Sequence, residues 1–425
     1  MKDDWCRMPT LTLLACCAVV FVMALQARWT RRFVKDFDLS WPKVDADKQA
    51  PVAVILPLRG ADPSLPGCLR GLLNQRYGSF ALHVVLDRAD DPAAQIVNEV
   101  FQAHPQFPVH IHVLKNPRRT CGLKVSALTQ VIEELSDSTA YFALIDADAQ
   151  PDPDWLSELV APFSDPTVGA TSGIRWYCPQ GDSLPDTVRR QWNGDAVVQM
   201  HSFQVPWGGS LAIRSEVASD PRTLERWRNC ICEDAPLAAT LKELGMRLQI
   251  VPNVILVNDE SIDLVGCFQF IRRQILFTLL HHPARKTLAA FWLLKTMWTV
   301  GLIVATVSNA MSGEIMWALV SGLAFLGGYV TQVLLLKQSA RAVRTAMTRR
   351  LGIVQKSRFD FHTMSAGLFT INFTAAAFLS ALMLRRVSWR GITYKVRKNS
   401  KIRMVRYLPY QPRDFANVVS QKSIA

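Results

Sequence analysis

The sequence predicts an α/β domain with a doubly wound, mostly parallel sheet, joined to α-helical membrane segments. Short apolar runs alternate with helical patterns between residues 50 and 145, which is typical of such a sheet. Four longer apolar stretches flank this region, and each approaches the roughly 20 residues that cross a bilayer. The chain has 425 residues. A single hydrophobic core is usually built from fewer residues, so we expect at least two structural units.

The predicted elements follow one another as strand, helix, strand. A polar linker, residues 36–50, precedes the first strand. In a sheet of this class ligands bind at the carboxyl ends of the strands, where Pro57, Asp87 and Asp146 fall. The strands are predicted at residues 51–57, 80–86, 109–114 and 141–145, and the helices at residues 65–75, 93–104, 124–135 and 235–245.

Residues 139–148 form an apolar run that ends in two carboxylates, Asp146 and Asp148. Side chains alternate along a strand, so both carboxylates can face one ligand. Their oxygens suit Mg²⁺ or Mn²⁺, which can bridge the phosphates of a nucleotide. The alternative is an ordinary turn, because two prolines follow.

The first apolar stretch, residues 10–27, has a basic flank that begins at Arg28 and ends at Lys35. A cleaved signal peptide carries its positive charge before the apolar run, so we expect an uncleaved anchor. The positive-inside rule then places the amino terminus outside and the following domain in the cytoplasm.

Three further apolar stretches lie near the carboxyl terminus, and core helices of a soluble protein are the alternative to three membrane segments. These stretches are residues 288–310, 315–336 and 365–384. The predicted organisation is an anchor (1–35), a cytosolic domain (36–285), transmembrane or interfacial helices (286–384) and a basic cytosolic tail (385–425).

The formal net charge is +13, and much of the excess lies beside the apolar stretches. Residues 385–413 contain no acidic side chain, so we expect contact with anionic membrane lipids. No recognition motif for nucleic acid accompanies them, so we expect no nucleic-acid partner. Three crossings after a cytosolic domain would put this basic stretch outside, against the positive-inside rule. We therefore predict that one segment does not cross fully, or that residues 337–364 hide a re-entrant piece.

Five motifs follow one another along the chain: Pro57-Leu-Arg-Gly60, Asp87 with Asp90 and Asp91, Gly122-Leu-Lys124, Asp146-Ala-Asp148 and Glu233-Asp234. In this order they resemble a family 2 glycosyltransferase with the GT-A fold. Within that family the chain is most similar to ceramide glucosyltransferases and related bacterial lipid glycosyltransferases, through residues 58–63, 90–93 and 389–394. The resemblance covers about residues 50–398.

The resemblance implies a role for each carboxylate of the donor site. Asp148 would bind Mg²⁺ or Mn²⁺, and Asp146 would share the metal or lie nearer the ribose and sugar. Asp87, Asp90 and Asp91 would hold the uracil and ribose, with the choice among the three left open. Asp90 alone is equally well explained as the cap of the following helix.

Lys124 and three backbone features complete the implied donor site. Lys124 begins a predicted helix, so its cation and the free backbone N–H groups can face phosphate, unless it is a solvated surface lysine. Pro57 ends the first strand beside the nucleotide. Gly208 and Gly209 would let the backbone approach the sugar or acceptor closely, unless they form an ordinary turn.

Glu233 and Asp234 precede a predicted helix, where carboxylates often serve only as caps. The resemblance implies instead that Asp234 is the general base that deprotonates the acceptor hydroxyl, with Glu233 beside the acceptor and sugar. Attack from the face opposite the leaving group would then invert the anomeric centre.

Gln269-Phe-Ile-Arg272-Arg273 stands where the family has Gln-x-x-Arg-Trp. Gln269 and Arg272 lie one helical turn apart, so they can share a face and reach the diphosphate or acceptor. The alternative is an interfacial helix whose arginines meet lipid phosphate. Arg273 replaces a tryptophan that would stack on an acceptor sugar, which argues against a processive polymerase.

The predicted function is transfer of one sugar, glucose by resemblance, from a UDP-sugar to a lipid hydroxyl. The expected acceptor is ceramide or a hopanoid-type lipid. A processive polysaccharide synthase and an inactive membrane scaffold are the alternatives. The intact Asp87, Asp148 and Asp234 argue against the scaffold.

Overall fold

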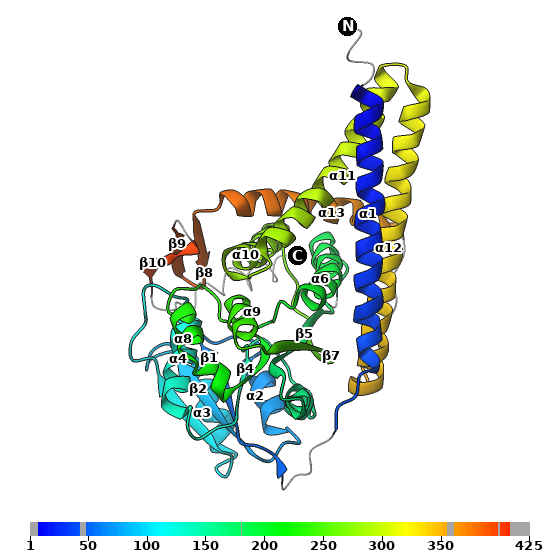
Figure 1. The fold of residues 1–425 in the computed structure, drawn as a ribbon. Helices are drawn as coiled ribbons and strands as arrows, with labels where there is room; N and C mark the ends of the chain where they lie inside the picture. Colours follow the sequence, from blue (N-terminus) through cyan, green and yellow to red (C-terminus); the bar gives the residue numbers. More distant parts are fainter. Residues whose placement is uncertain (1–6, 43–47, 180, 355–360, 398–399, 409–425) are drawn as a thin grey trace.

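The computed structural model describes residues 7–42, 48–179, 181–354, 361–397 and 400–408 (Figure 1). A sheet-based domain forms the larger part. Three long helices rise from it: α1 (Arg7–Lys35), α11 (Arg285–Met311) and α12 (Ile315–Leu351).

A seven-stranded sheet forms the centre of the α/β domain. The strand order is β3-β2-β1-β4-β6-β5-β7. Neighbouring strands run parallel, except that β6 is antiparallel to both β4 and β5. The predicted mostly parallel sheet is therefore confirmed. The strands are β1 (Val52–Leu58), β2 (Phe80–Leu86), β3 (Val109–Val113), β4 (Tyr141–Ile145), β5 (Val168–Tyr177), β6 (Ser210–Arg214) and β7 (Arg247–Asn258).

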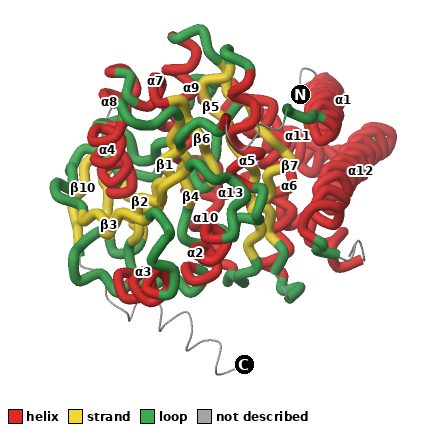
Figure 2. The backbone as a smooth tube through the Cα atoms, turned by 90° about the horizontal axis from the view of Figure 1, so that it is seen from below, coloured by secondary structure: helices red, strands yellow, loops and turns green. Residues whose placement is uncertain are grey.

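Helices connect these strands, and the four helices predicted within the domain agree with α2, α3, α4 and α9 to within two residues at each end. A short 3₁₀ turn, Asp36–Asp38, follows α1, and another, Ala161–Ser164, follows α5. Figure 2 shows the helices around the sheet. They are α2 (Leu65–Leu73), α3 (Ala93–Gln102), α4 (Leu123–Leu135), α5 (Trp155–Val160), α6 (Leu184–Phe203), α7 (Ser215–Ala218), α8 (Pro221–Trp227), α9 (Asp234–Glu243) and α10 (Leu264–His281).

The two faces of β1 contribute to two separate parts of the core. Ala53 and Ile55 belong to one apolar cluster, whereas Val54 and Leu56 belong to the other. All four are almost completely buried. The sequence of a parallel strand that is covered on both faces is a continuous apolar run, so this strand could be recognised in the sequence.

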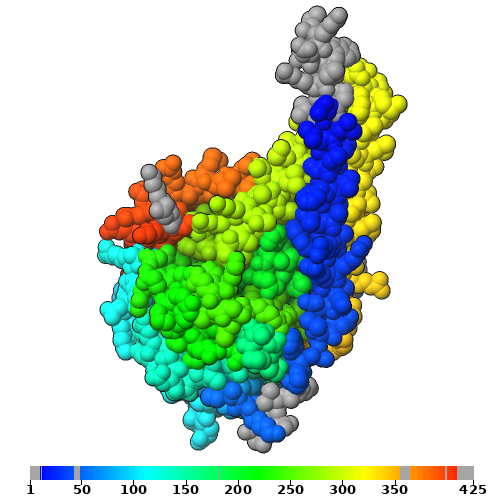
Figure 3. Space-filling view, in the orientation of Figure 1, coloured from blue at the N-terminus to red at the C-terminus, as the bar shows by residue number. Residues whose placement is uncertain are grey.

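The helices α1, α11 and α12 pack along one another and extend beyond the domain (Figure 3). Gly328 of α12 permits the close approach of α1, because a Cβ at this position would lie 2.5 Å from a methyl carbon of Val19. Outward-facing side chains are apolar and exposed, for example Val304 (59%) and Leu323 (67%). Within the described residues, four helices are long and apolar enough to cross a membrane, namely these three and α13.

The helix α12 is longer than the predicted segment 315–336. Its 37 residues span about 55 Å at 1.5 Å per residue, against about 30 Å for a hydrocarbon core. The last part lies beside the α/β domain, where Arg350 Nη1 is 2.7 Å from Glu158 Oε2. Residues 337–351 are thus continuous helix and contain no re-entrant turn, and the rest of the segment predicted to be re-entrant, residues 352–364, is not tested. Residues 355–360 lie outside the described residues.

The helix α13 (Phe361–Met383) runs across the direction of α1 and α12 (Figure 1). It packs on α10 and α6: the ring centroids of Phe373 and Phe268 are 5.3 Å apart, and Thr370 donates a hydrogen bond to Gln191 over 2.8 Å. The sequence analysis predicts that one apolar segment does not cross the membrane fully, and a helix that lies across the other long helices is what this prediction requires. Where α13 lies relative to a bilayer stays a prediction.

A three-stranded antiparallel sheet follows α13, with β8 (Arg386–Trp389), β9 (Ile392–Val396) and β10 (Ile402–Tyr407) in the order β10-β9-β8. It docks on the α/β domain. The amide of Met404 donates to the carbonyl of Arg119 over 2.7 Å, and the amide of Leu123 donates to the Tyr394 hydroxyl over 2.9 Å. The predicted basic tail therefore begins as part of the folded domain.

Candidate active site

Asp146 and Asp148 follow β4 at the carboxyl edge of the large sheet and share one guanidinium. Arg175 Nη2, from β5, lies 3.1 Å from Asp148 Oδ1 and 3.5 Å from Asp146 Oδ2. The same guanidinium stacks on Trp207, 4.6 Å from the ring centroid. The sequence analysis did not single out Arg175, because no motif surrounds it within its strand.

Burial and charge shift the two carboxylates in opposite directions. Burial raises the pKa of Asp148, and the nearby Asp146 adds to this rise against the effect of Arg175. Burial also acts to raise the pKa of Asp146, but Lys124 and Arg175 outweigh it, so the pKa of Asp146 is lowered. Asp148 is therefore the carboxylate that gains more from an additional cation.

Lys124, near the start of α4, is buried among acidic partners and is not a solvated surface lysine. Its Nζ lies 2.7 Å from Asp146 Oδ1 and 2.6 Å from Glu233 Oε1, and it donates to the Gly208 carbonyl over 3.1 Å. Burial acts to lower the pKa of Lys124, but the two carboxylates outweigh it and the pKa is raised. One lysine thus connects β4, the start of α9 and the glycine loop.

Asp234 is the first residue of α9, and its carboxylate contacts two backbone amides. Oδ2 accepts from the Gly208 amide over 3.0 Å, and Oδ1 accepts from the Ala235 amide over 2.6 Å. Glu233 occupies the N-cap position, but its side chain does not cap the helix. Burial raises the pKa of Glu233, while Lys124 opposes that rise. Both carboxylates therefore turn toward the glycine loop.

The loop of residues 207–210 passes between these carboxylates. A Cβ at Gly208 would lie 1.9 Å from Glu233 Oε1, and a Cβ at Gly209 would lie 2.6 Å from Asp146 Oδ2. An ordinary turn would tolerate a side chain at one of these positions. The two glycines therefore let the backbone pass close to the carboxylates, and a close approach to the sugar or acceptor stays a prediction.

Asp87 follows β2 and is covered by the C-terminal sheet. Its carboxylate pairs with Arg59 and accepts a hydrogen bond from the Tyr407 hydroxyl of β10. Arg59 Nε also donates to the Arg390 carbonyl over 2.9 Å. Burial and the contact with Asp87 raise the pKa of Tyr407 to about 12. The sequence analysis missed Tyr407, because it assigned the whole tail to lipid contact.

Asp91 and Asp90 have different surroundings. Asp91 is buried and accepts from the amides of Gly60 and Ala93 over 3.0 and 2.9 Å. Asp90 is exposed and pairs with Arg88 over 2.8 Å. Among the described residues, Asp91 and not Asp90 accepts from the first amide of α3, so the alternative of Asp90 as the helix cap is wrong. Asp91 fixes the loop after β1, and Pro57 is the second-last residue of that strand.

The two arginines of α10 have different neighbours. Arg272 Nη1 lies 3.4 Å from the Ser380 hydroxyl in α13, and Gln269 is exposed. Arg273 is near Arg175 and Asp148, and burial lowers its pKa to about 10. Consecutive residues point roughly 100° apart on a helix, so only one can face the site. Arg272 thus faces α13 and Gln269 faces outward, whereas Arg273 is the arginine of this helix that the carboxylates influence. The role of Gln269 and Arg272 at the diphosphate stays a prediction.

The metal prediction can be compared with the donor set. Among the described residues, no group of three or more His, Cys, Asp or Glu side chains is placed to hold a metal ion. Asp146 and Asp148 nevertheless reach the same cation, Arg175. Mg²⁺ is often bound through one or two carboxylates together with substrate phosphates. The residues therefore fit a divalent cation that shares phosphate oxygens.

A cavity of about 140 Å³ extends from the site toward the long helices. Arg175, Trp207 and Asp234 line one part of it, and the lining continues over α6 and α10 to Trp292 of α11 and Thr374 of α13. Most of the lining is apolar. We call it the acceptor-side cavity, because its lining includes Asp234, the residue expected to deprotonate the acceptor.

Comparisons with solved structures identify the fold. The mannosyltransferase PcManGT from Pyrobaculum calidifontis, in complex with GDP-Man and Mn²⁺, is similar with a TM-score of 0.54 and 20% identity, over 80% of this chain and 99% of that chain. Glucosyl-3-phosphoglycerate synthase from Mycobacterium tuberculosis, in complex with Mn²⁺, UDP and phosphoglyceric acid, has a TM-score of 0.38 and 14% identity, over 57% of this chain and 82% of that chain. The first likeness confirms the GT-A fold.

Sequence comparison identifies the family. The search of curated proteins found no match to the chain. The sequence profile of Glycosyl transferase family 21 matches residues 10–402, nearly the whole chain. This confirms the predicted resemblance to ceramide glucosyltransferase-like enzymes, although the matching family is 21 and not 2. The chain belongs to Glycosyl transferase family 21 and is a glycosyltransferase that takes its sugar from a nucleotide sugar.

Proposed function

We propose that the chain is an inverting membrane enzyme that transfers one glucose from UDP-glucose to the hydroxyl of a lipid such as ceramide. The acceptor-side cavity is the observation that carries the lipid acceptor. It joins Asp234 to helices that are apolar enough to cross a membrane. A water-soluble acceptor would need no apolar path of this kind.

Asp234 acts as the general base in this proposal. The acceptor oxygen forms a bond to the anomeric carbon while the bond from that carbon to the diphosphate breaks, and the acceptor proton passes to Asp234. The Gly208 amide holds one carboxylate oxygen in place. The cavity lining includes Asp234. An acceptor held there would attack from the face opposite the leaving UDP and invert the anomeric centre, as the resemblance implies.

Cations that already face the carboxylates would receive the diphosphate. Within the described part of the chain, Arg175 Nε is buried without a hydrogen-bond partner, so it can donate to a phosphate oxygen. Arg273 adds a second charge. Asp146 and Asp148 would hold Mg²⁺ or Mn²⁺, which neutralises charge on the departing diphosphate. Asp87 and Asp91 would bind the uridine side.

A panel of donors and lipids tests this function. The purified protein is incubated with UDP-glucose, UDP-galactose, UDP-N-acetylglucosamine or GDP-mannose and a lipid extract, and released nucleotide and new glycolipids are measured. The proposal expects UDP release coupled to a lipid that gains one hexose. A soluble polymer would identify a processive synthase, and no turnover with any donor would identify an inactive scaffold.

The orientation in the membrane is a separate part of the proposal. Three crossings by α1, α11 and α12, with α13 at the interface, would leave both the catalytic domain and the tail in the cytoplasm. Exposed basic residues of the C-terminal sheet, such as Arg386, Lys395 and Arg403, would then face anionic lipids. A cysteine introduced at position 423 should resist an impermeant thiol reagent until cells are permeabilised. Labelling of intact cells would overturn this orientation.

A further inference from the structure

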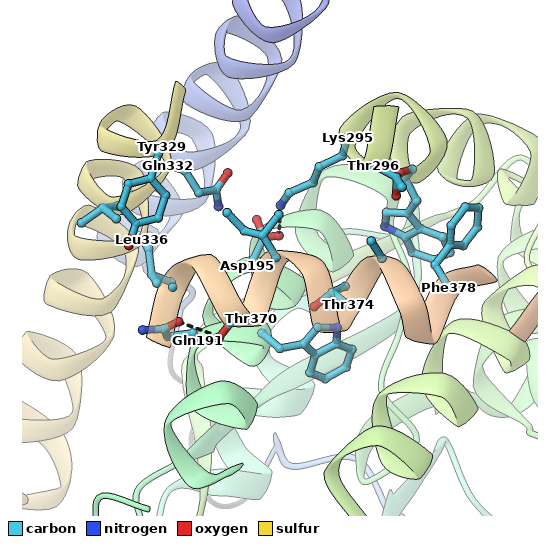
Figure 4. A pocket seen from close by; sticks show the side chains of 16 residues that line it. Gln191, Asp195, Lys295, Thr296, Tyr329, Gln332, Leu336, Thr370, Thr374 and Phe378 are labelled. Atoms are coloured by element: carbon cyan, nitrogen blue, oxygen red, sulfur yellow. Dashed lines mark hydrogen bonds and ion pairs between the residues drawn. The ribbon is translucent and has the colours of Figure 1, made fainter. Parts of the chain in front are cut away.

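A second cavity, of about 60 Å³, lies between α6, α11, α12 and α13 (Figure 4). We call it the membrane-side cavity. Its lining combines apolar side chains such as Leu336 and Phe378 with a few polar ones. Thr370 and Gln191 already hydrogen-bond each other over 2.8 Å. The lining therefore offers an apolar surface to a lipid chain and a small number of polar groups that can recognise its head.

The two cavities meet at an ion pair. Their linings share Trp192, Asp195, Trp292, Lys295 and Thr374. Lys295 Nζ of α11 lies 2.6 Å from Asp195 Oδ2 of α6, and both side chains are largely buried. A path that starts at Asp234 therefore passes this pair before it reaches the space between the long helices.

The Lys295 ammonium has N–H donors that the ion pair does not satisfy. Asp195 Oδ1 accepts from Gln26 over 3.1 Å, and Oδ2 also accepts from Gln199 over 3.0 Å. Among the described residues, the ammonium of Lys295 has one hydrogen-bond partner, Asp195. An ammonium carries three N–H donors, so two remain for a ligand.

Gln332 of α12 gives an independent indication of a ligand. Its side chain lines the membrane-side cavity and is about nine-tenths buried. Within the described residues its Oε1 has no hydrogen-bond partner. Figure 4 shows Gln332 and Lys295 pointing toward each other beside Asp195. Buried carbonyl oxygens are normally satisfied, so a group that carries an N–H or O–H fits this position.

We propose that Lys295, Asp195 and Gln332 bind the polar linkage that joins the head of the acceptor to its apolar chains. An oxygen of the linkage accepts from Lys295, and an N–H or O–H of the linkage donates to Gln332. One chain occupies the membrane-side cavity. This inference rests on the proposed function and adds a selection for lipids with an amide or hydroxyl beside the reacting alcohol, over lipids whose linkages are all esters.

The first experiment compares two acceptors with equal chains, N-acylsphingosine and diacylglycerol, with UDP-glucose as donor and the full-length protein in nanodiscs. Lys295→Met should raise the KM for N-acylsphingosine roughly 10- to 100-fold, because a hydrogen bond to a charged group is lost. The KM for UDP-glucose should stay within about twofold, as expected for a contact made only with the acceptor. Gln332→Met should reduce the preference for N-acylsphingosine over diacylglycerol. Lys286→Met, an exposed lysine at the start of the same helix, is the matched control.

The opposite pattern would overturn the inference. If Lys295→Met lowers the melting temperature and affects both KM values equally, with unchanged acceptor preference, the pair only fastens α11 to α6. Recovery of the acceptor KM by Lys295→Arg would support a donor role. Transfer to no lipid by the wild-type protein would instead refute the proposed function, and this inference with it.

A second variant tests the chain itself. Ala375→Trp adds bulk to the membrane-side cavity from α13. The variant should keep activity with a short N-acyl chain, which shows that it folds, and lose activity with long chains. An unchanged chain-length profile would place the lipid chains outside this cavity.

Discussion

The donor edge of the sheet and the acceptor-side cavity differ in how they are built. At the donor edge, Asp146, Asp148 and Glu233 are each matched by Lys124 or Arg175 at 2.6–3.5 Å. The acceptor-side cavity is mostly apolar and contains one ion pair, Asp195 with Lys295, within its described lining. At the donor edge, charge would therefore select the ligand. In the acceptor-side cavity, shape and a few polar groups would select it.

Asp234 lies where the two regions meet, so its substitution should have the largest effect. Asp234→Asn should lower kcat by about 10²- to 10⁴-fold, the usual cost of a lost general base. Donor binding should persist, because the donor edge keeps its charges. Calorimetry with UDP and steady-state kinetics measure the two quantities. Asp137→Asn, at an exposed aspartate, is the control, and near-normal turnover of Asp234→Asn would mean that Asp234 only orders the glycine loop.

Asp148→Asn should affect the donor edge alone. Loss of a residue that only hydrogen-bonds to a metal ligand costs roughly 10- to 100-fold in metal affinity, so loss of a ligand itself should cost at least as much. Donor affinity should fall in the presence of Mn²⁺ and change little in its absence. The affinity for lipid acceptor should not change. A titration of Mn²⁺ at fixed UDP-sugar gives the answer, and identical metal dependence in the variant would remove Asp148 from the metal site.

The arginines of α10 provide a matched pair. Arg273→Leu should reduce kcat/KM for the donor about 10-fold or more, since it removes a charge near the carboxylates. Arg272→Leu removes a contact with α13 and should have a much smaller effect on the donor. Parallel kinetics of the two variants would decide between them. A larger loss in Arg272→Leu would support the assignment of Arg272 made from the sequence.

The smallest expected effect concerns pH. Burial lowers the pKa of His281 to about 4, and the neutral ring accepts from the Ile231 amide over 3.1 Å. The unfolded chain binds this proton near pH 6.5, so His281 supports stability above that pH and loses this contribution as the pH falls toward 4. Melting temperatures between pH 7 and 4.5 should fall more in the wild type than in His281→Gln. Equal slopes would show that His281 is not responsible.

Much of the donor edge could be predicted from the sequence, because its residues follow short apolar strands. The strands β2 and β4 have the predicted bounds, and Asp87 and Asp146 follow them directly. Local order along the chain carries that information, since the carboxyl ends of parallel strands meet at one edge.

Residues that act across long distances could not be found in this way. Arg175 lies inside a buried strand and is distinguished only by the carboxylates that fold against it. Tyr407 contacts Asp87 across 320 positions of sequence. The choice between Arg272 and Arg273 depends on the rotation of α10, which is set by its packing against α13. Helical spacing alone cannot fix such a rotation.

The most direct test of the account is to locate the acceptor by photocrosslinking. A ceramide analogue with a photoreactive group near its hydroxyl is irradiated with the full-length protein and UDP, and labelled peptides are identified by mass spectrometry. We expect labels around Phe270 of α10 and Trp292 of α11, both in the acceptor-side cavity, that unlabelled ceramide removes. Labels confined to outward-facing residues such as Val304 and Leu323, or insensitive to competition, would contradict the claim that the donor edge and a lipid cavity meet at Asp234.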